Sequence, residues 1–93
     1  MRRYTYTVAL LREADGGFSV SVPSLPGCAT QGDTLEESLE HAQEAIQGYV
    51  DSLVIDGEPV PEDRVAFAID VEEPTEVLVR QVSVDAREAL IAA

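Results

Sequence analysis

Few residues in this chain are of types that could do chemistry: one histidine, one cysteine and some dispersed carboxylates. Nucleophilic catalysis needs a base beside a nucleophile and a third group that orients the base. His41 falls inside a predicted helix, between Glu37 and Ala45, so a structural or solvent-facing role is favoured. Cys28 has no cation nearby in the sequence to lower the pKa of its thiol, which favours a buried thiol that packs in a loop.

A metal-dependent nuclease would need carboxylates that converge from different strands around paired ions. Asp15, Asp33 and Asp70 could be proposed as such a cluster. However, Asp15 and Asp33 are explained by a turn and a helix cap, and the other acidic residues concentrate on one helix face and in loops. We therefore predict no catalytic residue, no metal site and no cofactor.

The elements that would position these residues begin with a hairpin. Residues 4–12 and 18–22 alternate between the two faces of a strand, and Asp15-Gly16-Gly17 between them is typical of a tight turn. This pattern predicts two antiparallel strands with one buried face. Pro23, Pro26 and Gly27 then predict a compact loop, and a short third strand is weakly indicated over 28–32.

A long acidic helix follows this hairpin. Thr34 and Glu37 have the spacing of a capping box, and Gly57 followed by Pro59 is typical of a helix end. Apolar residues recur at steps of three and four over 35–53, which predicts a core-facing stripe. The opposite side has no Lys or Arg and consists of Glu36, Glu40, Glu44, Gln47 and Asp51. Like charges four residues apart cost about 0.2–0.5 kcal/mol per pair.

The remaining chain predicts further strands. Residues 65–71 alternate and predict a strand that packs its large side chains on the helix. The predicted fold class is α+β: an antiparallel three- to four-stranded sheet covered on one face by one long helix, in the order β-β-β-α-β. Residues 1–73 would form this domain, and 74–93 would add a short C-terminal strand and a helix over 86–92. We expect that segment to join subunits through an apolar strand edge, with candidate residues Val77, Val79, Val82 and Val84.

Composition bounds the class of protein. Ninety-three residues suffice for one domain with a modest core, and one cysteine with no apolar leader predicts a cytoplasmic protein.

The net charge of the chain is −12, from eighteen acidic residues and six arginines. This charge repels phosphate backbones, so no direct binding of nucleic acid is expected from this chain alone. The charge would either attract a basic partner or simply keep the protein soluble. No membrane segment is expected.

Several motifs in order give this chain a resemblance to a known family. They are Asp15-Gly16-Gly17-Phe18, Val20-x-Val22-Pro23, Leu25-Pro26-Gly27-Cys28, Thr30-Gln31-Gly32-Asp33-Thr34 and the helix from Glu36 to Tyr49. Residues 4–71 thereby resemble the N-terminal domain of HicB-type antitoxins, which is described as a partial ribonuclease-H-like fold. The Leu-Pro-Gly-Cys and Gln-Gly-Asp-Thr pair is the specific part of this signature.

The resemblance implies a function. HicB-like antitoxins of bacterial type II toxin–antitoxin systems bind and block HicA toxins, small basic ribonucleases that cleave mRNA. Such an antitoxin would occupy the surface that the RNA phosphates use. The candidate toxin-binding residues in this chain are the acidic Glu36, Glu37, Glu40 and Glu44, and a platform shaped by Phe18, Pro26, Gly27 and Cys28.

The C-terminal part departs from the family pattern. Many HicB proteins have a C-terminal DNA-binding domain, and 77–90 resembles the first strand and helix of a ribbon-helix-helix unit without the second helix. With Arg80 and Arg87 as the only cations after residue 70, it falls short of a DNA-binding surface. A homodimer or homotetramer is expected. The alternative functions are a residual RNase-H-like metal-dependent nuclease and a stand-alone oligomeric scaffold or regulatory module.

Overall fold

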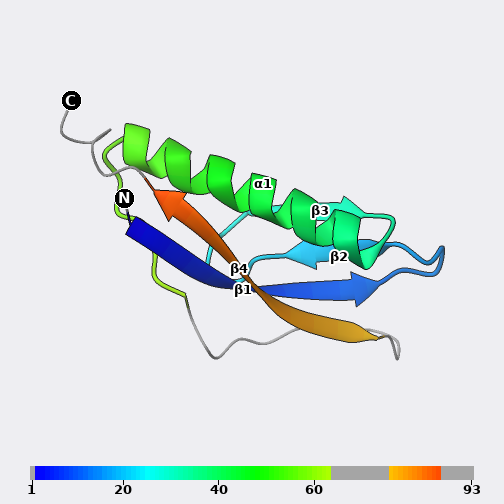
Figure 1. The fold of residues 1–93 in the computed structure, drawn as a ribbon. Coiled ribbons are helices and arrows are strands. Elements are labelled where there is room, and N and C mark those ends of the chain that lie inside the picture. The colour runs from blue at the N-terminus through cyan, green and yellow to red at the C-terminus, as the bar shows by residue number, and fades with distance from the viewer. Residues whose placement is uncertain (1, 64–75, 87–93) are drawn as a thin grey trace.

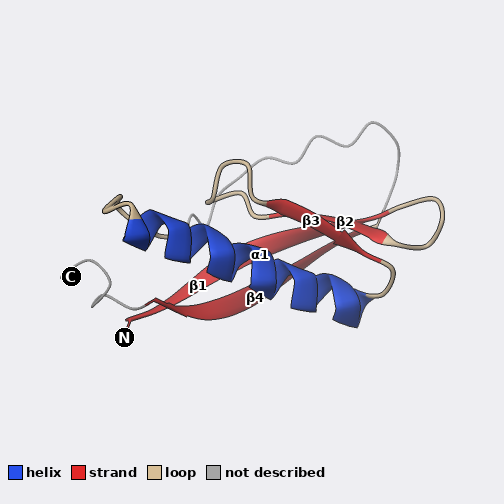
Figure 2. Ribbon diagram, turned by 90° about the horizontal axis from the view of Figure 1, so that it is seen from above, coloured by secondary structure: helices blue, strands red, loops and turns tan. Residues whose placement is uncertain are grey.

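The described residues form four antiparallel strands and one long helix (Figure 1). The computed structural model describes residues 2–63 and 76–86. Seen from above, the helix lies across one face of the sheet (Figure 2). Among the described strands the order is β3-β2-β1-β4, so β3 and β4 are the outer strands of this part of the sheet. The elements are β1 (Arg2–Arg12), β2 (Phe18–Ser21), β3 (Ala29–Gly32), α1 (Leu35–Ile55) and β4 (Val77–Ala86). The predicted fold class and the order of elements are confirmed.

The first hairpin forms at the predicted turn. β1 and β2 pair antiparallel, with Arg12 opposite Phe18, and Glu13 N–H donates to Gly17 O at 2.8 Å. Gly16 has a φ of 95°, a conformation that residues with a Cβ rarely adopt. The Asp15 carboxylate accepts a hydrogen bond from Gly17 N at 2.9 Å and so fixes the turn locally.

The helix begins and ends with local hydrogen bonds that the sequence specifies. The Thr34 hydroxyl accepts from Glu37 N at 3.1 Å, which is the N-cap half of the predicted capping box. At the other end, Gly57 has a φ of 71° and donates to Val54 O, while Glu58 N–H donates to Leu53 O. This pair of bonds is a Schellman motif, which satisfies the last free carbonyls of the helix.

The core lies between α1 and one face of the sheet. The alternation of residues 4–12 puts Tyr4, Tyr6, Val8 and Leu10 on one face of β1, and all four side chains are buried. On the helix, the buried stripe continues to Val54, one residue beyond the predicted Leu53, which is half-buried. Burial of this apolar area is the main force that holds the helix on the sheet. The buried hydrophobic residues on β1, β2 and α1 are Tyr4, Tyr6, Val8, Ala9, Leu10, Phe18, Val20, Ala42, Ile46, Val50 and Val54.

The helix comes very close to β3 at its first turn. A Cβ on Gly32 would lie 2.6 Å from Ser38 N and 2.7 Å from Ser38 Cα, which are backbone atoms that cannot move aside cheaply. Ser38 is itself fully buried, and its hydroxyl donates to Thr34 O at 2.6 Å. Gly32 therefore sets how closely α1 can pack on β3.

The strand that closes the sheet after the helix is β4. It pairs antiparallel with β1 from Arg2↔Ala86 to Leu11↔Val77. The sequence placed this strand in a segment beside the domain of residues 1–73, whereas in the structure it belongs to the same sheet. Ala86 was expected to begin a last helix but is the final residue of β4. The predicted strand at 65–71 and the rest of the helix predicted over 86–92 lie outside the described residues.

Asp63 joins the segment after the helix to the sheet. Its carboxylate accepts from Thr7 N at 3.0 Å, from the Thr7 hydroxyl at 2.7 Å and from the Ser24 hydroxyl at 2.9 Å. Nearby, the Tyr6 hydroxyl donates to Pro61 O at 2.6 Å. Burial raises the pKa of Tyr6 to about 12, with smaller contributions from neighbouring charged groups, so this hydroxyl keeps its proton.

Candidate partner-binding surface

The acidic stripe predicted on α1 is present in the structure. The side chains of Glu36, Glu40 and Glu44 are exposed on the same side of the helix. Among the described residues, none of the three takes part in an ion pair or a side-chain hydrogen bond. The helix also has no basic residue in its last turn. This stripe is therefore an exposed negative surface without internal neutralisation.

Glu37 has a different environment from the other three glutamates. Its backbone N–H donates to the Thr34 hydroxyl, and its carboxylate accepts a long hydrogen bond from Asp33 N at 3.5 Å. The side chain is half-buried. The bond to its carboxylate comes from Asp33, one residue before the N-cap Thr34, so the side-chain half of the predicted capping box is shifted by one residue. Because its side chain turns back to the start of the helix, Glu37 is less available to a partner than Glu36, Glu40 and Glu44.

The predicted platform residues separate into two groups. Phe18 is 4% exposed and Cys28 is 7% exposed, so both are core residues that shape the surface from beneath. Burial also raises the pKa of the Cys28 thiol, as expected for an unreactive packed cysteine. Pro26 and Gly27 are exposed at the loop, where Pro26 O accepts from the Tyr49 hydroxyl at 2.8 Å. Only these two platform residues can meet a partner directly.

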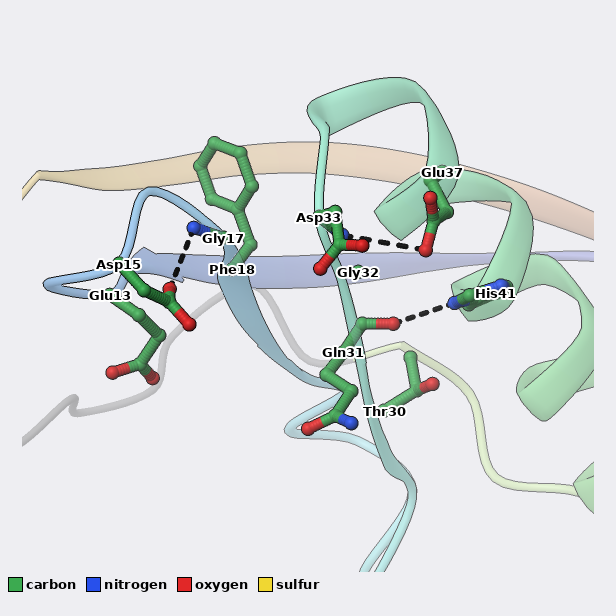
Figure 3. Close-up of a pocket in the computed structure, with 10 residues that line it drawn as sticks. All are labelled: Glu13, Asp15, Gly17, Phe18, Thr30, Gln31, Gly32, Asp33, Glu37 and His41. Atoms are coloured by element: carbon green, nitrogen blue, oxygen red, sulfur yellow. Dashed lines mark hydrogen bonds between the residues drawn. The ribbon is translucent and has the colours of Figure 1, made fainter.

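A shallow pocket of about 360 Å³ lies between the hairpin turn, β3 and the start of α1 (Figure 3). Tertiary structure brings carboxylates from three segments to its walls, although the sequence separates them widely. No group of three or more potential ligands in residues 2–63 and 76–86 has the arrangement of a metal site. Asp70 lies outside the described residues. The titratable side chains of the pocket are Glu13, Asp15, Asp33, Glu37 and His41.

His41 joins the helix to the edge strand at this pocket. Its Nδ1 lies 2.6 Å from Gln31 O, and because a carbonyl only accepts, Nδ1 is the donor. This bond is the largest effect and raises the pKa of His41, while partial burial acts in the opposite direction. The nearby carboxylates of Glu37, Glu44 and Glu40 each add a smaller increase. The bond also blocks one carbonyl of the β3 edge.

The four valines proposed for oligomerisation do not form one surface. Val84 is 3% exposed and Val82 is half-buried, and both face the core under α1. Val77 and Val79 point to the opposite face, and Val79 is 51% exposed. All four valines belong to β4, a strand of ten residues at one end of the described strand order.

Sequence reasoning missed two features of this surface. The pocket depends on pairing between β2 and β3 and on the approach of α1, which no spacing in the sequence specifies. The second is a groove between α1 and the outer side of β4, lined by Leu39, Glu40, Gln43, Gln81, Val82 and Ser83. Within the described residues, no helix is long and apolar enough to cross a membrane.

Comparisons with known proteins agree with this fold. A family model described as the HicB-like antitoxin of bacterial toxin–antitoxin systems matches residues 6–90. The UPF0150 protein ssr1765 of Synechocystis is 47% identical over 60 residues, which span 64% of this chain and 76% of that protein.

Two solved structures share the fold. The N-terminal domain of Burkholderia pseudomallei antitoxin HicB matches with a TM-score of 0.67 and 26% identity, over 88% of this chain and 99% of that one. A chain of a toxin–antitoxin complex from Streptococcus pneumoniae matches with a TM-score of 0.77 and 18% identity, over 90% of this chain and 70% of that one. The family match spans nearly the whole chain, and its motifs lie in the hairpin, the loop and the helix described above. This chain therefore belongs to the HicB-like antitoxin family of bacterial toxin–antitoxin systems.

Proposed function

We propose that this chain neutralises a small basic toxin of the HicA type, an mRNA-cleaving ribonuclease, by covering the toxin's RNA-binding surface. The observation that carries the proposal is the exposed stripe of Glu36, Glu40 and Glu44, which has no ion-pair partner within the described residues. A surface that binds RNA phosphates is cationic, so it is also complementary to a row of carboxylates.

The stripe is costly for the isolated helix, which supports a functional role. Glu36, Glu40 and Glu44 repel each other at four-residue spacing, and only Glu36 lies in the first turn, where the helix dipole favours negative charge. A cationic partner would remove this repulsion when it binds. The same net charge of −12 makes this chain by itself a poor ligand for nucleic acid.

Neutralising the stripe tests the proposal. The double variant Glu36→Gln/Glu44→Gln should bind the cognate toxin about two- to thirtyfold more weakly, since exposed charge pairs contribute about 0.2–1 kcal/mol each. Its affinity should also depend less on salt, because fewer charges are screened. Isothermal titration calorimetry over a series of salt concentrations measures both effects.

A control variant separates this surface from total charge. Asp56→Asn/Glu58→Gln removes the same charge from exposed positions at the other end of α1. We expect it to bind toxin as the unchanged protein does. Equal losses in the two double variants would show that net charge alone matters, and no loss in either would refute the electrostatic mechanism.

A further inference from the structure

The middle of α1 contains a glycine that the described fold does not require. Gly48 is exposed, and a Cβ at this position would meet no atom within 4 Å beyond the adjoining helix backbone. The glycines of the described chain that need a positive φ are Gly16, Gly27 and Gly57. A glycine inside a helix is less stable than an alanine, because its backbone loses more conformational freedom on folding. Neither packing nor backbone conformation within the described residues therefore accounts for Gly48.

Gly48 continues the row that the acidic stripe begins. Residues four apart lie on one ridge of a helix, so the three glutamates of the stripe lead directly to Gly48 and then to Ser52. One turn further, Ile55 is 68% exposed, and it is the more exposed of the two large apolar side chains that the described part of the chain leaves open to solvent. The outer face of α1 is therefore acidic in its first half, and low and partly apolar in its second half.

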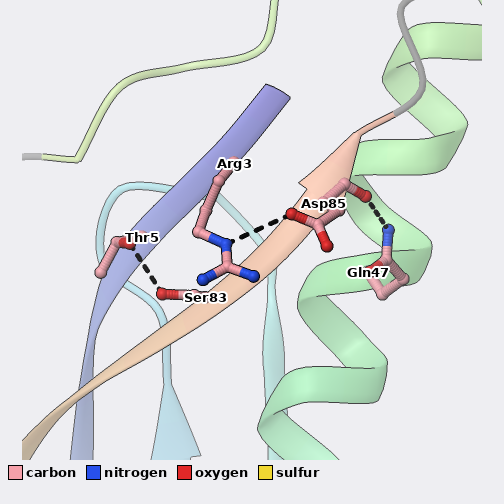
Figure 4. Close-up of polar contacts among 5 residues, drawn as sticks. All are labelled: Arg3, Thr5, Gln47, Ser83 and Asp85. Carbon is pink, nitrogen blue, oxygen red and sulfur yellow. Dashed lines mark hydrogen bonds and ion pairs between the residues drawn. The ribbon is translucent and has the colours of Figure 1, made fainter. Parts of the chain in front are cut away.

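The side chains beside Gly48 are held by bonds to other elements. On one side, the Gln47 amide donates to Asp85 O of β4 at 2.8 Å (Figure 4). On the other side, the Tyr49 hydroxyl donates to Pro26 O at 2.8 Å. These bonds keep both side chains from swinging over Gly48, so the open position exists before a partner arrives. Such preorganisation lowers the entropy that binding costs.

Charge and spacing select the class of partner for this face. The acidic stripe repels nucleic acid and also a second copy of this chain, whose net charge is −12, whereas it attracts a cationic protein surface. Successive carboxylates of the stripe are four residues apart, which is about 6 Å along the axis. Side chains at the same step on a second helix repeat at the same distance, while alternate residues of a strand are about 6.6 Å apart. A cationic helix therefore matches the stripe along its length.

We propose that a cationic helix of the toxin lies along the outer face of α1 and approaches it most closely at Gly48. This inference rests on the function proposed above and adds the geometry of the contact. Cations four residues apart on the toxin helix face Glu36, Glu40 and Glu44, while an apolar residue beyond them packs on Ile55. The missing side chain at Gly48 lets the two helix backbones come closer than larger side chains allow. The contact at Ile55 removes exposed apolar surface from water.

Filling the open position tests the close approach. Gly48→Gln places a polar side chain there without a change of charge, and glutamine is a better helix former than glycine, so the variant should unfold about 2–4 °C higher. The same variant should bind the cognate HicA-type toxin at least about tenfold more weakly, because its side chain must be accommodated in the contact. Gly48→Ala adds a single carbon and should lose less. Thermal unfolding and isothermal titration calorimetry measure the two effects, and unchanged toxin affinity of Gly48→Gln would refute the close approach.

A second variant tests the apolar end of this face, with a matched control. Ile55→Ser removes the exposed apolar side chain and should weaken toxin binding about three- to tenfold. Val79→Ser removes the other exposed apolar side chain, which lies on the face of the sheet away from α1, and should leave toxin binding unchanged. A loss with Val79→Ser as large as that with Ile55→Ser would contradict the placement on α1.

The outcomes separate this inference from the proposed function. An unchanged protein that does not bind the toxin would overturn both. Normal toxin binding by the unchanged protein together with normal binding by Gly48→Gln or Ile55→Ser would overturn the helix contact alone.

Discussion

At the scale of single residues, the chain places one titratable group where protonation strengthens a tertiary contact. His41 donates to the Gln31 carbonyl from the side of α1, and both the bond and the surrounding carboxylates favour the charged imidazolium. The pKa of His41 is therefore raised above its ordinary value of 6.5. Cys28, the other residue of reactive type, is buried among apolar side chains and is held as a neutral thiol.

This arrangement predicts a pH dependence of stability with a definite sign. Because the pKa of His41 is raised in the folded state, its contribution is fully present below pH 6.5 and is lost as pH rises through the folded-state pKa. When the pH is lowered from 8 to about 6, the unfolding temperature of the unchanged protein should therefore rise more than that of the variant His41→Gln. An NMR titration of the His41 ring provides a direct check, and a midpoint below 6.5 would contradict the argument.

At the scale of elements, the helix is held by its two caps and by one close approach to a strand. The Thr34 hydroxyl satisfies Glu37 N, the Schellman motif at Gly57 closes the other end, and Gly32 lets the first turn contact β3. These features orient the acidic stripe relative to the sheet. A helix that frayed at its first turn would lose the fixed position of Glu36 and the contact of His41 with β3.

The N-cap offers a clean test at this scale. Thr34→Ala should lower the free energy of unfolding by about 1 kcal/mol, because Glu37 N loses its acceptor. Thr34→Ser should recover most of the stability, since serine supplies the same oxygen. Ser52→Ala, at an exposed position in the same helix, provides a control and should change stability by less than about 0.5 kcal/mol. Urea denaturation measures all three, and a Thr34→Ala variant as stable as the control would mean that the cap is not needed.

At the scale of the whole molecule, segments far apart in sequence are joined by a few polar contacts. Asp63 connects the chain after the helix with Thr7 on β1 and Ser24 in the Pro-Gly loop. Between β1 and β4, Arg3 binds Asp85 and the Thr5 hydroxyl lies 2.8 Å from that of Ser83 (Figure 4). The exposed Arg3–Asp85 pair contributes little, whereas Asp63 is half-buried and satisfies several donors.

Removing Asp63 should therefore affect the whole molecule. Asp63→Ala removes the carboxylate that accepts from the Thr7 N–H, the Thr7 hydroxyl and the Ser24 hydroxyl, and it should lower the free energy of unfolding by about 2 kcal/mol. Asp63→Asn keeps one acceptor oxygen and should lose less. By comparison, Asp85→Ala removes only an exposed ion pair and should lose at most about 1 kcal/mol. Denaturation curves rank the three variants, and an Asp85→Ala loss larger than that of Asp63→Ala would reverse this interpretation.

The sequence alone determined those features that depend on residues near each other in the chain. The alternation of β1 and β2, the Asp15-Gly16-Gly17 turn, the Thr34 cap and the Gly57 stop all act within a few residues, and the structure confirms each one. The acidic stripe could also be predicted from the sequence, because helical spacing fixes which glutamates share a face.

Tertiary structure alone decided which distant segments meet. It placed β4 beside β1 and brought Asp15, Asp33 and His41 to one pocket. Strand order and register depend on packing between residues up to 84 positions apart, as in the pairing of Arg2 with Ala86, and no local signal encodes such a contact. Local propensities therefore specify the elements of this antitoxin, while burial of their apolar faces against one another determines its surfaces.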